Sequence, residues 1–155
     1  MSKFDPAAVL AALERQRAAY VLIGDLAGVL HGSDLLARTV EITPSLKPEN
    51  IERLEQALTD LAVEKPERVR DLADGKRLVI TTPAGTLDLN PLPDGSTGYN
   101  DLRRGAERQP LGQGLRPLVA SPPDLVRTLS PDAEPLLIPR LRRIMELDRS
   151  LAPEM

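Results

Sequence analysis

The chain contains no cysteine and a single histidine, His31, among its 155 residues. Disulfides, thiolate metal sites and cysteine nucleophiles are therefore excluded, as is a multi-histidine zinc site within one chain. Aromatic residues are almost as scarce, because Phe4, Tyr20 and Tyr99 are the only three. The core must be built from Leu, Val, Ile and Ala, and no aromatic platform for stacking single-stranded nucleic acid is predicted.

Long hydrophobic runs are also missing. No stretch approaches the roughly 20 apolar residues that a spanning helix needs, and the N-terminal MSKFDPAAVL has no extended apolar segment. We therefore expect a cytoplasmic protein without a membrane partner. A net charge of −3 and a pI near 5.3 disfavour nucleic acid as a partner, since dedicated nucleic-acid binders usually carry a basic surplus.

What remains is the composition of a globular protein. Hydrophobic residues make up 41% of the chain and charged residues 28%, and this length is most simply one domain. We predict a single domain over residues 1–155, with a core at about 5–120 and a C-terminal helical region at 121–151. The fold class is α/β or α+β, with a small mixed sheet flanked by helices.

Hydrophobic periodicity and turn residues place the elements. Asp5 and Pro6 are typical of a helix start, and Pro83-Ala84-Gly85 is typical of a hairpin turn. The charged segment 63–76 is predicted to be a short strand with turns or a surface loop. We expect helices at 5–17, 26–31, from 48, at 99–106, at 121–129 and beyond 131, and strands at 20–23, 38–43, 77–82, 86–91 and 115–120.

The stretch from Tyr20 to Thr43 is the most informative part of the chain. A strand runs through Gly24 into a short helix, and unpaired amides at a helix start are a suitable place to hold phosphate. The second strand alternates, so Thr39, Glu41 and Thr43 share one face. In the later hairpin arm, Asp88 and Asn90 share the face opposite Leu87 and Leu89.

Four segments carry a resemblance to a known family: VLIGDLAGVLHGS at 21–33, ARTVEIT at 37–43, GTLDLNPLP at 85–93 and VASPPDLVRTL at 119–129. Together they resemble the nucleotidyltransferase superfamily of the DNA polymerase β type, in the small bacterial branch that includes the AbiEii-like toxins. The resemblance extends over about residues 5–147. It implies a nucleotidyltransferase-like fold with Glu41 and Asp88 on adjacent strands, facing the same way.

In that family, carboxylates two residues apart on one strand and a third on a neighbouring strand hold two Mg²⁺ ions. The metals bridge the triphosphate of an NTP during transfer of a nucleoside monophosphate to a hydroxyl. The resemblance thus implies Mg²⁺ as cofactor and an NTP as ligand. It assigns catalysis to Glu41 and Asp88, metal binding to Glu41, Asp88 and the Thr43 position, and phosphate binding to Gly24, Asp25, Gly32 and Ser33.

The chain departs from the family pattern at three of these positions. Glu41 is one methylene longer than the aspartate expected there, and Thr43 replaces a second carboxylate with a neutral oxygen. Asp25 brings a negative charge to the place where phosphate would lie. Like charges near a partly buried site repel by a few kcal/mol at an effective dielectric of about 20. A complete two-metal site is therefore disfavoured.

Simpler interpretations exist for the same residues. Asp25 is what a plain N-cap of the helix from Leu26 would be, and His31 is expected to close that helix with a hydrogen bond. Glu41 and Asp88 can be read as solvated strand residues, and Arg103 with Arg104 as a solvated helix face.

Two hypotheses for the function follow. The first is an active Mg²⁺-dependent nucleotidyltransferase, either toxin-like or modifying a small molecule. The second is a non-catalytic descendant that binds a nucleotide or a protein partner, or forms a homodimer. The replaced carboxylate at Thr43 favours the second hypothesis.

Overall fold

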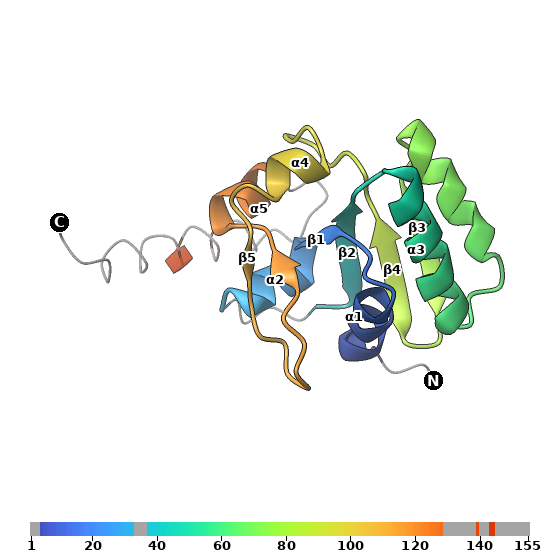
Figure 1. The fold of residues 1–155 in the computed structure, drawn as a ribbon. Helices are drawn as coiled ribbons and strands as arrows, with labels where there is room; N and C mark the ends of the chain where they lie inside the picture. The colour runs from blue at the N-terminus through green and yellow to red at the C-terminus, as the bar shows by residue number, and fades with distance from the viewer. Residues whose placement is uncertain (1–3, 33–36, 129–138, 140–142, 145–155) are drawn as a thin grey trace.

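Six strands form one mixed sheet within the residues that the structure, a computed structural model, describes: 4–32, 37–128, 139 and 143–144 (Figure 1). The helix expected beyond residue 131 therefore lies largely outside the described residues. The strands are β1 (Tyr20–Ile23), β2 (Thr39–Pro44), β3 (Leu78–Thr82), β4 (Gly85–Leu89), β5 (Glu107–Arg108) and β6 (Leu118–Val119). The predicted class, a mixed α/β domain with a small mixed sheet, is confirmed.

The strands are ordered β3-β4-β2-β1-β6-β5. β2 runs antiparallel to β1 and parallel to β4, so it joins the two halves of the sheet. β1 pairs on its other side with β6 in parallel, and β6 pairs with β5 antiparallel. The first and second strands of the chain therefore lie at the centre of the sheet.

Helices cover the sheet in two groups. They are α1 (Pro6–Arg15), α2 (Gly24–Leu30), α3 (Pro48–Asp60), α4 (Tyr99–Leu102), α5 (Pro122–Thr128) and the 3₁₀ helix η1 (Pro66–Asp74). α1, α3 and η1 pack on one another and contact β2, β4 and β3. α2 contacts β1, β2 and α5, and Figure 1 shows α2 and α5 together at the end of the molecule away from α3 and η1.

Alternation along the strands separates an apolar face from a polar one. In β3, Leu78 and Ile80 are buried while Val79 between them is 54% exposed. Leu87 and Leu89 of β4 are fully buried on the same side as Ile80 and Leu78, because those residues are register partners. Period-2 alternation therefore places the positions of Glu41 and Asp88 on the face that carries the exposed Val79.

The hairpin β3–β4 around Pro83-Ala84 is confirmed, and so are the starts of α1 and α3 at their prolines. Three element predictions need correction. The segment predicted as a strand or loop at 63–76 contains η1, because Val69 and Leu72 are spaced to bury one side of a 3₁₀ helix. α4 is shorter than predicted, and β5 was not predicted.

No helix in the part of the chain that the structure describes has the length and apolar character needed to cross a bilayer.

Candidate functional site

Glu41 and Asp88 are brought together by the sheet. They are direct register partners in the parallel pair β2–β4. Asp88 is buried, and the Glu41 side chain is 22% exposed. The expectation that both carboxylates lie on adjacent strands and face the same way agrees with this register.

A guanidinium lies across these two carboxylates. Arg77 Nε donates to Asp88 Oδ1 at 2.9 Å, and Arg77 Nη2 donates to Asp88 Oδ2 at 2.5 Å. The same Nη2 is 3.8 Å from Glu41 Oε2, within ion-pair distance. A planar guanidinium matches a carboxylate in this two-bond arrangement better than an ammonium would. The single guanidinium of Arg77 is therefore the counter-charge for both acidic side chains.

Glu41 has a raised pKa in this setting. The largest cause is burial, which penalises the charged form. The hydrogen bond from Asn90 Nδ2 to Glu41 Oε2, 3.1 Å long, and the charge of Arg77 oppose that rise, whereas the charges of Asp88 and Asp25 add to it. The carboxylates are thus crowded, and only part of their repulsion is offset.

The start of α2 lies against the same carboxylate. Gly24 has a φ of +74°, and a Cβ there would be 2.7 Å from Glu41 Oε1. Glycine is needed for both reasons, since a side chain would be strained and would collide. Asp25 lies in the first turn of α2 and Ile23 is the N-cap, so the N-cap prediction for Asp25 is wrong. An acidic residue in the first turn still interacts favourably with the helix dipole.

The residues predicted to bind phosphate are not gathered in one place. Gly24 and Asp25 begin α2, whereas Gly32 follows its C-terminal end. Ser33 lies outside the described residues. His31 is the C-cap, and its backbone N–H donates to the carbonyls of Ala27 and Gly28 at 3.1 Å, which confirms that it closes the helix by hydrogen bonding. Its side chain serves another contact, because Nε2 donates to the carbonyl of Ala120 at 2.7 Å.

Thr43 lies on the sheet face of Glu41, two residues along β2. It is fully buried, and its hydroxyl has no hydrogen-bond partner, the one such side-chain atom among the buried groups of the described residues. A buried hydroxyl without a partner costs about 1–3 kcal/mol. The position that would carry the second carboxylate of the family is therefore neutral and enclosed.

These donors do not fit a two-metal centre. Asp88 already makes two hydrogen bonds to Arg77, and Thr43 offers no charge. Among the residues that the structure describes, no group of three or more histidines and carboxylates is arranged to hold a metal ion. Mg²⁺ prefers oxygen ligands in near-octahedral geometry, and here the carboxylates face an arginine instead.

Arg77 was missed in the sequence interpretation. It lies two residues before Val79, whose register partner is Asp88. Because alternate residues of an extended chain share a face, this spacing puts Arg77 on the Asp88 side of the hairpin. The spacing is present in the sequence, and it indicates a contact with Asp88 only together with the register of the hairpin.

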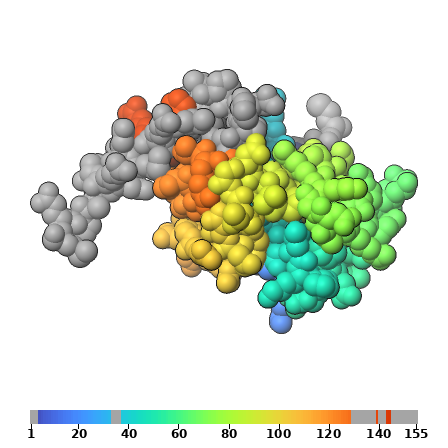
Figure 2. Space-filling view, turned by 90° about the horizontal axis from the view of Figure 1, so that it is seen from above, coloured from blue at the N-terminus to red at the C-terminus, as the bar shows by residue number. Residues whose placement is uncertain are grey.

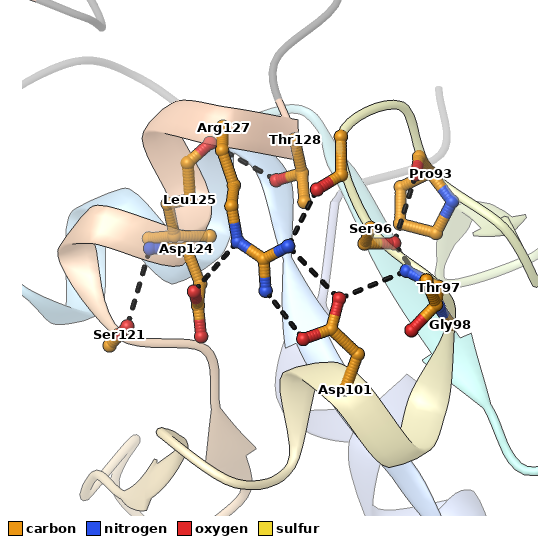
Figure 3. A network of polar contacts seen from close by, with 11 residues as sticks. Pro93, Ser96, Thr97, Gly98, Asp101, Ser121, Asp124, Leu125, Arg127 and Thr128 are labelled. Carbon is orange, nitrogen blue, oxygen red and sulfur yellow. Dashed lines mark hydrogen bonds and ion pairs between the residues drawn. The ribbon is translucent and has the colours of Figure 1, made fainter.

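A second arginine-centred cluster lies at α5 (Figure 3). Arg127 makes a two-bond ion pair with Asp101 of α4, at 2.8 and 2.9 Å, and its Nε donates to Asp124 at 2.9 Å. Arg127 Nη1 also donates to the Gly95 carbonyl at 2.6 Å. These bonds lower the pKa of Asp101 to about 2, chiefly through the hydrogen bonds from Arg127. The cluster joins α4, α5 and the loop before α4.

Comparisons of the chain with protein families, with curated proteins and with solved structures found no match.

Proposed function

We propose that the chain is a non-catalytic protein of the nucleotidyltransferase-like fold that acts by binding a nucleotide or a protein partner. In this proposal the positive charge of Arg77 neutralises the carboxylates that would bind metal ions in a catalytic nucleotidyltransferase. The observation that carries it is the position of the Arg77 guanidinium, paired with Asp88 and within 3.8 Å of Glu41.

The chemistry supports this choice. A guanidinium is always charged and offers only N–H donors, so it can neutralise two carboxylates but cannot activate an attacking oxygen as a Lewis acid. Asp25 and Glu41 both place negative charge at the start of α2, where a triphosphate would have to approach. The pair of carboxylates on adjacent strands supports the proposed fold likeness, and the charges around the pair favour a protein cation over a metal–phosphate complex.

The test is thermal unfolding with and without Mg²⁺, combined with a labelled-NTP transfer assay. The unmodified protein is expected to show no Mg²⁺-dependent rise in Tm and no transfer. Arg77→Ala is expected to gain a Mg²⁺-dependent rise in Tm, because Asp88 and Glu41 are then free to bind the ion. Arg77→Ala combined with Asp88→Asn is the matched control, and it should lose that rise.

Robust transfer by the unmodified protein would overturn the proposal. A Mg²⁺-dependent rise in its Tm that Asp88→Asn abolishes would overturn it as well. A chain carrying Thr43→Asp and Asp25→Gly restores two features of the family pattern, and transfer by this variant alone would support descent from a catalytic site.

A further inference from the structure

Two adjoining cavities meet at Tyr99, away from the carboxylate site. One, of about 290 Å³, lies between the end of α1, the start of β1 and the β5–β6 pair. The other, of about 230 Å³, lies between the end of β2, the start of α3 and α4. Ala19 and Tyr99 line both. In Figure 2 the yellow and gold atoms around α4 border the cyan atoms where β2 ends and α3 begins.

The two cavities are lined by an excess of positive charge. Glu14 and Glu49 are their acidic residues. The basic ones are Arg17, Lys47, Arg53, Arg103 and Arg108. The chain as a whole has a net charge of −3, so this is a local reversal of sign. Gathered cations of this kind raise the local concentration of anions.

The five cations differ from Arg77 and Arg127 in the contacts that they make. Within the described part of the chain, none of the five forms a salt bridge, in contrast to Arg77 and Arg127. Arg53 and Arg108 donate only to backbone carbonyls, at 3.5 and 3.0 Å. Glu14 accepts a hydrogen bond from the hydroxyl of Tyr20 at 2.9 Å, so this carboxylate is engaged by a residue of the protein and not by one of the cations.

The buried side-chain amide of Asn50 holds backbone that lines the cavities. Asn50 accepts from the backbone N–H of Ala19 at 2.7 Å and donates to the carbonyls of Ala19 and Ser45, at 2.9 and 2.8 Å. Asn50 is 2% exposed, so these bonds are shielded from water. The backbone of Ala19, which lines both cavities, and that of Ser45, which lines one of them, is therefore fixed before a ligand binds, and this lowers the entropy cost of binding.

Tyr99 adds an aromatic surface between the two cavities. The guanidinium of Arg103 lies 5.9 Å from the centre of its ring, at cation–π distance. Together the cavities reach the lower size range of small-molecule sites, about 300–1,000 Å³. Cations around a preformed hollow with one aromatic side chain suit a small ligand with several negative charges.

From these observations we propose that the Tyr99 cavities bind a small molecule carrying a polyphosphate chain. The ligand is either a nucleoside triphosphate or a free polyphosphate, and the phosphate chain is the recognised group in both. The site is separate from the carboxylate site, because it lies where β1 starts and β2 ends, whereas Glu41 is paired with Ile23 at the end of β1. The proposal therefore stands whether or not the proposed function does.

Isothermal titration with tripolyphosphate, ATP and adenosine, without Mg²⁺, tests the proposal. Tripolyphosphate and ATP are expected to bind and adenosine is not. Affinity should fall as salt is raised, because the contacts are ionic. Replacing both Arg53 and Arg103 by Ala is expected to weaken binding at least about tenfold, since charge-assisted hydrogen bonds are lost.

Two variants serve as controls. Arg104→Ala removes an exposed arginine next to Arg103 that does not line either cavity, and Asp88→Asn changes the carboxylate site. Neither should change the affinity. If ATP binds more tightly than tripolyphosphate, the ligand is a nucleoside triphosphate. If the two bind equally, the phosphate chain alone is recognised and the ligand is a free polyphosphate. Absence of binding by both, unchanged affinity in the double variant, or loss of binding in Asp88→Asn would overturn the proposal.

Discussion

Two clusters in this protein have the same composition and different roles. In each, one arginine faces two carboxylates: Arg77 with Asp88 and Glu41, and Arg127 with Asp101 and Asp124. The first lies on one sheet face, where register fixes the positions of both acids. The second joins separate elements at the surface (Figure 3). In the first cluster burial is the main cause of the pKa shift of Glu41, whereas in the second hydrogen bonding is the main cause of the pKa shift of Asp101.

The contrast appears in the direction of the pKa shifts. Burial raises the pKa of Glu41 although Arg77 is nearby, while the hydrogen bonds from Arg127 lower the pKa of Asp101 to about 2. An arginine therefore does not make every neighbouring acid stronger. At Glu41 the loss of hydration outweighs an ion pair at 3.8 Å, whereas Asp101 accepts two hydrogen bonds from its arginine, at 2.8 and 2.9 Å.

The largest expected difference between the two clusters is the loss of unfolding free energy when the arginine of each is replaced by alanine. Arg77→Ala leaves the buried Asp88 and the half-buried Glu41 without a counter-charge, so the free energy of unfolding is expected to fall by about 2 kcal/mol. Arg127→Ala should lower it less, because Asp101 and Asp124 are both partly open to water, whereas Asp88 is buried. Urea unfolding of both variants measures the difference.

Hydrogen exchange supplies the control for this comparison. Arg127→Ala should speed amide exchange in α4, in α5 and in the loop that contains Gly95, since those segments share the arginine. Arg77→Ala should leave exchange in α4 and α5 unchanged relative to the rest of the chain. An equal or larger loss of unfolding free energy in Arg127→Ala would contradict the interpretation.

The pH dependence of stability should have opposite signs at the two clusters. The folded protein holds the Glu41 proton more tightly than the unfolded chain does, so the Glu41 contribution to the unfolding free energy falls as pH rises above its ordinary pKa of 4.5. The Asp101 contribution is present above 3.8 and is lost as pH falls toward about 2.

Urea unfolding across the acid and neutral range checks these slopes. Glu41→Gln should remove the decline on the high-pH side, and Asp101→Asn should remove the loss on the acid side. If Glu41→Gln lost stability relative to the unmodified protein as pH rose above 4.5, the raised pKa would be refuted.

The smallest expected effect concerns the hydroxyl on the sheet face of Glu41. Thr43→Val keeps the shape and removes the unpartnered group, so the unfolding free energy should stay the same or rise by up to about 1 kcal/mol. Thr82→Val is the matched control, because the buried Thr82 hydroxyl donates to Gly85 and accepts from Ala84. That variant should lose about 1–2 kcal/mol. A comparable loss in Thr43→Val would mean that its hydroxyl is bonded in solution.

The sequence was informative where a pattern repeats. Alternation predicted β2 and the β3–β4 hairpin, and helical spacing predicted α3. β5 is only two charged residues, Glu107 and Arg108, with no alternation to detect. η1 is a 3₁₀ helix in which most residues are charged, so its two buried side chains, Val69 and Leu72, lie among arginines and acids and give no clear helical pattern.

The sequence predicts the two carboxylates of the candidate site, but it does not predict the arginine that neutralises them. Two residues on known strands, Glu41 and Asp88, follow from periodicity. Arg77 lies just before β3, and its contact depends on the register of the hairpin as well as on its own spacing. The Tyr99 cavities could not be read from the chain, because they unite side chains from α1, α3, α4 and β5 that are far apart in sequence.

The place of β1 in the sheet has a consequence for how the chain folds. β1 pairs with β2, which follows it closely, and also with β6, which comes near the end of the described strands. One edge of β1 therefore stays unpaired until residues 118–119 have been synthesised. Contacts that close so long a loop form slowly. We expect β1–β4 to fold first as a partial sheet, and the docking of β6 with α5 to complete the protein last.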